Sequence, residues 1–94
     1  TDNNSRIWAK KLSELLGQPV IVENRPGAGG NIGTEYAAKA KPDGYTLLYA
    51  TQGTMAANKF LYKSLPFDPL SDFEMIHGMF RTPLILVTNA KTNL

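Results

Sequence analysis

The chain has 94 residues, of which 43% are hydrophobic and 19% charged, and its formal net charge at pH 7 is +2. This length allows one globular domain at most, and the scattered lysines and arginines give no reason to expect a nucleic-acid or anionic-membrane partner. The absence of cysteine excludes disulfides and Cys-ligated metals. The apolar run at 84–87 is far shorter than the ~20 residues of a membrane span, so the protein is not expected to be membrane-embedded.

The first predicted element is a helix over residues 3–16. Its apolar side chains share one helical face, which is expected to pack in a core with Trp8 included. Thr1 and Asp2 are typical of a helix N-cap, with Asp2 accepting from the first free N–H groups, and Gly17 suits the residue just past the end. A strand normally precedes such a helix in an α/β sheet, so the chain is expected to begin inside a domain, without its first strand.

Residues 19–48 are predicted to form a β-α-β unit. The apolar run 20–22 is typical of a strand buried on both faces, and the glycine-rich loop 25–30 leads to a helix with Asn31 as N-cap. Pro42-Asp43-Gly44 ends that helix, and residues 45–50 form the second strand. A strand, helix and strand joined this tightly pair as a right-handed parallel crossover.

The rest of the chain extends the same α/β pattern. A small polar loop at 51–54 precedes a third predicted helix at about 55–62, and a loop with two prolines follows at 63–69. One helical turn is expected at 69–72, and strands are expected at 74–80 and 83–88. The predicted fold class is therefore α/β, with a mostly parallel sheet and flanking helices.

Candidate ligand-binding residues precede the three predicted helices, because ligands of open α/β sheets bind where strands lead into helices. The hydroxyls, amide and free N–H groups there donate to a carboxylate without a buried charge. The primary candidates are Thr1, Asp2, Thr51, Gln52, Gly53 and Thr54, with Gly29, Gly30 and Asn31 as possible secondary residues. The alternative for residues 51–54 is simple capping of the third helix.

The loop Gly27–Gly33 is open to three interpretations. A dinucleotide fingerprint would need glycine at position 32, which is Ile, and an acidic residue after the strand 45–50, which is absent. The other two interpretations are a tight turn that lets helix and strand pack closely, and a site for an anion or polar ligand. Arg25 could bind a ligand carboxylate or make a surface pair with Glu23 or Asp43.

No catalytic site is predicted. His77 has no second histidine or acidic neighbour at ligand spacing, and no nucleophile, base and oxyanion hole come together in the sequence. We therefore expect no catalytic residue, no metal and no cofactor.

Several motifs resemble those of one protein family. They are GQPVIVENRPGAGGNIG at 17–33, KPDGYTLL at 41–48, LPFDP at 65–69 and Asp72-Phe73. In these motifs the sequence resembles the substrate-binding receptors of tripartite tricarboxylate transporters, the Bug-type periplasmic proteins, over nearly its whole length. The resemblance implies part of the first lobe of a type II periplasmic binding protein fold. Residues 1–94 would then be a partial N-terminal lobe, with the second lobe absent.

The resemblance also implies a function. Such receptors capture small organic anions, including di- and tricarboxylates, acidic amino acids and aromatic acids, and deliver them to membrane permease subunits; they are not enzymes. They are periplasmic, and this sequence shows no signal-peptide pattern. As a fragment with uncovered strand edges, the chain is expected to self-associate or exchange strands. The alternatives are a nucleotide-binding α/β enzyme domain that uses Gly27–Gly33, and an interaction module that binds no small ligand.

Overall fold

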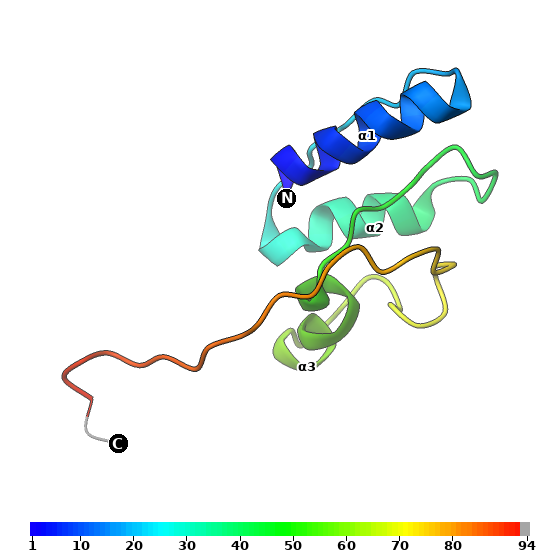
Figure 1. Ribbon diagram of the computed structural model, residues 1–94. Helices are drawn as coiled ribbons and strands as arrows, with labels where there is room; N and C mark the ends of the chain where they lie inside the picture. The colour runs from blue at the N-terminus through cyan, green and yellow to red at the C-terminus, as the bar shows by residue number, and fades with distance from the viewer. Residues whose placement is uncertain (93–94) are drawn as a thin grey trace.

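The computed structural model describes residues 1–92, and its regular elements are helices. They are α1 (Asp2–Leu16), the 3-10 turn η1 (Ala28–Gly30), α2 (Asn31–Lys39), the π-helical turn η2 (Gly53–Ala57) and α3 (Asn58–Leu61). In Figure 1 the helices occupy one end of the molecule, and the C-terminal segment extends away from them. The overall dimensions are 56 × 27 × 21 Å. No helix within residues 1–92 has the length and apolarity of a membrane-spanning segment.

The first helix forms because its local signals agree. Gly17 ends α1 in the left-handed conformation, with φ 67°, and its N–H donates to the Ser13 carbonyl, as predicted for a C-terminal cap. The N-cap is Thr1 rather than Asp2, and its side chain makes no capping hydrogen bond. The prediction that Trp8 lies in a core is wrong, because Trp8 is 41% exposed and only Ala9 of α1 is buried.

The predicted mostly parallel sheet is wrong for residues 1–92. None of the four predicted strands forms: the chain is irregular at 20–22, 45–50, 74–80 and 83–88. Apart from the bonds inside helices, the backbone hydrogen bonds in this part of the chain join residues no more than four apart. The parallel crossover and the sheet of a type II periplasmic binding fold are therefore absent from the described residues.

The physical reason is that a strand requires a partner. An apolar run indicates a segment that tends to be buried, but a strand forms only when a neighbouring segment satisfies its N–H and C=O groups. Within residues 1–92 no such pairing occurs, and the apolar side chains of these segments are largely in solvent: Ile21 is 86% exposed and Leu86 98%. Large exposed apolar patches of this kind are uncommon on soluble monomers.

The segment between α1 and α2 connects the two helices through side chains. The Val20 N–H donates to Ser13 Oγ at 2.8 Å, and the Asn24 amide donates to Asp2 at 2.8 Å, so this segment is fixed along α1. Arg25 lies over the ring of Tyr36 in α2, with its guanidinium carbon 3.6 Å from the ring centroid. Figure 1 shows this segment running back along α1 before it enters α2.

Candidate functional site

The loop Thr51–Thr54 divides into an exposed half and a buried half. Thr51 and Gln52 are exposed, Gly53 is half-buried, and Thr54 is buried. The Thr54 hydroxyl donates to the Thr51 carbonyl at 3.2 Å and accepts from the Thr51 N–H at 3.4 Å. This hydroxyl is therefore used within the loop, whereas the side chains of Thr51 and Gln52 face solvent.

A π-helical turn begins inside this loop, at Gly53. In η2 the N–H of Asn58 donates to the Gly53 carbonyl, five residues earlier, and the chain then continues as α3. The predicted third helix at 55–62 is thus confirmed, although it begins earlier and contains this wider turn. Single π-turns are rare and often occur at functional sites, because the extra residue redirects the side chains of one turn.

The glycine-rich loop adopts left-handed backbone conformations. Gly29 has φ 63° and Gly30 φ 91°, and Ala28 between the glycines has φ 49°, a conformation that L-residues seldom adopt. A Cβ atom on Gly29 would lie 2.9 Å from the Tyr62 hydroxyl, and one on Gly30 would lie 2.9 Å from Thr54 Cγ2. Both glycines are needed for backbone conformation and for close approach of the helical segment that contains η2 and α3.

This geometry favours one of the three interpretations of the loop. The space beside Gly29 and Gly30 is filled by side chains of the same protein, as expected for a turn that permits close packing. The packing partner differs from the one predicted, since it is a helical segment rather than a strand. Of the secondary candidates, Gly30 lies against Thr54 of the loop 51–54, and Gly29 lies against Tyr62 and Asn58.

A pair of buried amides joins the two loops. Asn31 is buried and is the first residue of α2; it is not the N-cap, which is Gly30. Its side-chain oxygen accepts from Asn58 Nδ2 at 2.8 Å, and the same nitrogen lies 3.3 Å from the Gly29 carbonyl. Sequence reasoning missed Asn58. Its only signal was an asparagine inside a helical stretch, where asparagine is a poor helix former.

Thr1 and Asp2 are exposed, and their hydrogen bonds within residues 1–92 reach neither of the other two loops. Asp2 accepts from the Asn24 amide and from Arg6 Nε at 3.0 Å. The Asn24 hydrogen bond, together with the charge of Arg6, holds the pKa of the Asp2 carboxyl below its usual value. The structure therefore brings together 51–54 with 29–31, while Asp2 connects α1 to the segment that follows it.

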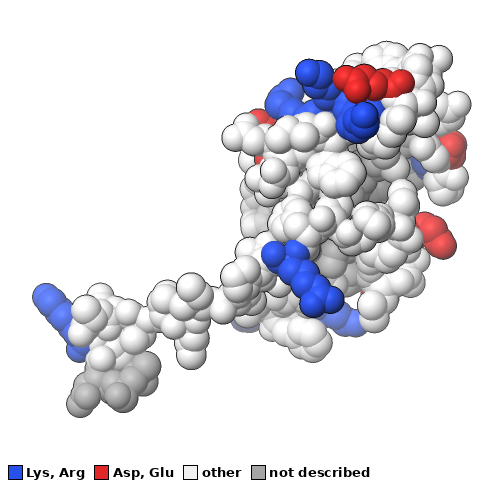
Figure 2. All heavy atoms as spheres, viewed as in Figure 1, with Lys and Arg blue, Asp and Glu red and all other residues white. Residues whose placement is uncertain are grey.

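Arg25 is used within the protein. Its guanidinium forms a salt bridge with Glu23 and lies over the ring of Tyr36. This confirms the interpretation of Arg25 as a surface-pair residue with Glu23. Figure 2 shows positive and negative side chains close together at the top of the view, above a face that is mostly uncharged.

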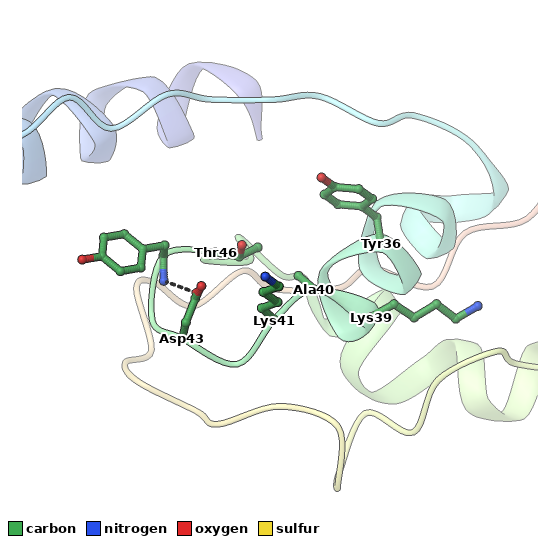
Figure 3. Close-up of a pocket in the computed structure, with 7 residues that line it drawn as sticks. Tyr36, Lys39, Ala40, Lys41, Asp43 and Thr46 are labelled. Carbon is green, nitrogen blue, oxygen red and sulfur yellow. Dashed lines mark hydrogen bonds between the residues drawn. The ribbon is translucent and has the colours of Figure 1, made fainter.

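A separate hollow of about 430 Å³ lies between the end of α2 and the turn that follows it. Figure 3 shows Asp43 accepting from the Tyr45 N–H across this turn, and Lys39 pointing away from the other residues. The Lys39 ammonium pairs with Glu35 on the same helix. The hollow contains none of the candidate binding residues.

The side chains of the candidate residues at 29–31 and 51–54 are hydroxyls and amides without formal charge. Within residues 1–92, no three histidine or acidic side chains come together as a metal site requires. Hydroxyls, amides and backbone N–H groups of this kind can hold a carboxylate directly or through water.

Comparisons with known proteins identify the family. The model of the tripartite tricarboxylate transporter family receptor matches residues 5–94. Protein BugT of Bordetella pertussis is 44% identical over all of this chain and 29% of its own length. A UPF0065 protein of Bordetella bronchiseptica is 42% identical over 94% of the chain and 26% of its own length. One of Agrobacterium vitis is 40% identical over 93% of the chain and 25% of its own length.

No solved structure gives a significant match. The chain spans between a quarter and three tenths of the length of these three curated relatives. The match nevertheless covers almost the whole chain, and it includes the glycine-rich loop and the loop 51–54. The resemblance seen in the sequence motifs is confirmed: this chain belongs to the tripartite tricarboxylate transporter receptor family.

Proposed function

We propose that this chain is part of an extracytoplasmic solute receptor that binds a small organic carboxylate. The observation that carries the proposal is the match of residues 5–94 to the receptor family. We propose further that residues 1–94 contribute to one lobe of the receptor. The receptor would deliver its ligand to the permease subunits of a tripartite tricarboxylate-type transporter, and it would act by binding, without catalysis.

The main residues proposed to contact the ligand are Thr51 and Gln52. Both are exposed, and both belong to the loop 51–54, which hydrogen bonds between Thr51 and Thr54 hold in place. Gly53 would contribute its backbone, and Thr54 would shape the loop from its buried position. Thr1 and Asp2 remain a second proposed contact, with Thr1 as the better donor because the Asp2 carboxylate repels an anion.

Neutral donors suit a receptor for carboxylates. Hydrogen bonds from hydroxyls and amides to a charged acceptor are stronger than neutral pairs and require no buried cation. Water bridges would adapt the same donors to carboxylates of different size. The packing of Gly29 and Gly30 against Tyr62 and Thr54 supports this function over a nucleotide-binding enzyme, because it accounts for the glycines without a phosphate.

The test is a calorimetric titration of the natural gene product that carries this sequence. The probes are citrate, succinate, glutamate and benzoate, which represent the four proposed ligand classes. At least one should bind saturably, and Gln52→Ala should weaken that binding by about tenfold, the loss of roughly 1.4 kcal/mol expected for a hydrogen bond to a charged group. Lys59→Gln, on the exposed side of α3, is the matched control. Saturable binding of a dinucleotide with no carboxylate binding would refute the proposal.

A further inference from the structure

Asn58 makes hydrogen bonds to both loops of the candidate site. Its backbone N–H donates to the carbonyl of Gly53, inside the loop 51–54. Its side-chain nitrogen donates to Asn31 Oδ1 at 2.8 Å and lies 3.3 Å from the Gly29 carbonyl. Asn58 therefore connects the loop 51–54 to the glycine-rich loop. Its two side-chain partners, Asn31 and Gly29, lie 27 and 29 positions earlier in the chain.

The surroundings of Asn58 make this connection specific. Asn58 and Asn31 are both 6% exposed, so water does not readily replace the bond between them. Thr34, also buried, donates from its hydroxyl to the Gly30 carbonyl at 2.8 Å, which fixes the far side of the glycine-rich loop. On the near side, the methyl group of Thr54 fills the space beside Gly30. A displacement of either loop would break a buried hydrogen bond or open a gap in this contact.

We propose that Asn58 is a positioning residue for the loop 51–54. Its hydrogen bonds hold the Gly53 carbonyl next to the Gly29 carbonyl and Asn31. They thereby fix the positions of Thr51 and Gln52. Asn58 itself does not touch the ligand. The glycine-rich loop then supports the loop 51–54 through Asn58. The positioning role of Asn58 rests on the proposed carboxylate-binding function.

The direction of the Asn58–Asn31 bond gives a sharp test, because Asn58 is the donor and Asn31 the acceptor. Asn58→Asp keeps the shape of the side chain but removes the donor, so that two acceptors face each other. Asn31→Asp also keeps the shape and retains the acceptor. Each variant introduces one buried carboxylate, and a role that depended only on packing would make the two equivalent.

The experiment uses isotope-labelled natural gene product and two measurements. The first is the set of backbone amide NMR signals of residues 29–31 and 51–54, and the second is citrate binding by calorimetry. Asn58→Asp should shift the amide signals of both loops and weaken citrate binding at least tenfold. Asn31→Asp should change citrate affinity less than threefold, and Lys59→Gln should leave both measurements unchanged.

The outcomes separate this proposal from the proposed function. If Asn58→Asp loses its dispersed spectrum, Asn58→Ala replaces it, and the same joint shift of both loops is expected. The proposal is overturned if the signals of 51–54 stay in place while those of 29–31 move, or if the two aspartate variants behave alike. If the unmodified protein binds none of the four carboxylates, the proposed function fails, and the amide signals still decide whether Asn58 connects the loops.

Discussion

The contact between Gly30 and Thr54 leads to a prediction that separates backbone conformation from close packing. An alanine at Gly30 carries two costs, because φ is 91° and the new Cβ would lie 2.9 Å from Thr54 Cγ2. Gly44 is the matched control: its φ is 82°, and a Cβ there meets nothing within 4 Å. The two substitutions therefore share the conformational cost and differ in the steric one.

The expected magnitudes follow from these two costs. A left-handed conformation costs an L-residue about 1–2 kcal/mol, so Gly44→Ala should lower the free energy of unfolding by that amount. Overpacking adds about 1–3 kcal/mol, so Gly30→Ala should lower it by ~2–5 kcal/mol. Thr54→Ser removes the methyl group but keeps the hydroxyl that bonds to Thr51. In the Gly30→Ala background it should recover most of the steric part.

The assay is urea unfolding of the natural gene product, followed by circular dichroism at 222 nm. The four chains of the double-mutant cycle and Gly44→Ala are compared at one protein concentration. The reasoning is refuted if Gly30→Ala and Gly44→Ala lower the free energy of unfolding equally. It is also refuted if Thr54→Ser, added to Gly30→Ala, lowers the free energy of unfolding further instead of raising it.

Two further predictions concern α1 and the exposed apolar segments. The pKa of Asp2 is lowered chiefly by the Asn24 hydrogen bond. The ionised Asp2 carboxylate should therefore stabilise the fold at pH values above its unfolded pKa of about 3.9, and this stabilisation should be lost as the pH falls through the lower folded pKa. An NMR pH titration of Asn24→Ala should show the Asp2 pKa moving up toward its usual value, and an unchanged pKa would contradict this assignment. The isolated 94-residue chain should self-associate through residues such as Ile21 and Leu86, and Leu86→Lys should reduce that association; a monomer in sedimentation at 100 µM or so would contradict this inference.

Local features were predictable from the sequence because they depend on residues close together in the chain. The helix α1, its end at Gly17 and the turn after α2 follow from side-chain periodicity, the conformational freedom of glycine and the restriction imposed by proline. The glycine-rich loop was also recognisable, both as an irregular segment and as a family motif. A helical segment was correctly expected after Thr51, but it begins inside the predicted loop 51–54, because η2 already includes Gly53 and Thr54.

The wrong predictions concern how separate segments meet. The apolar runs at 20–22 and 45–50 predicted strands, but apolar character does not specify a hydrogen-bonding neighbour, and within residues 1–92 these runs remain unpaired. The apolar face of α1 likewise predicted a buried Trp8, although burial requires an opposing surface that the helical arrangement does not supply.

The sequence by itself determined the three helical segments, the end of α1 at Gly17, the family and the polar character of the candidate binding loops, since each depends on short-range chemistry or on motif order. Only the tertiary structure decided that Asn58 bonds to Asn31, that Thr54 is buried against Gly30, and that the predicted strands do not pair in the described residues. These features depend on contacts between residues far apart in the chain. Whether such contacts form depends on the free energy of bringing the segments together, which no local pattern specifies.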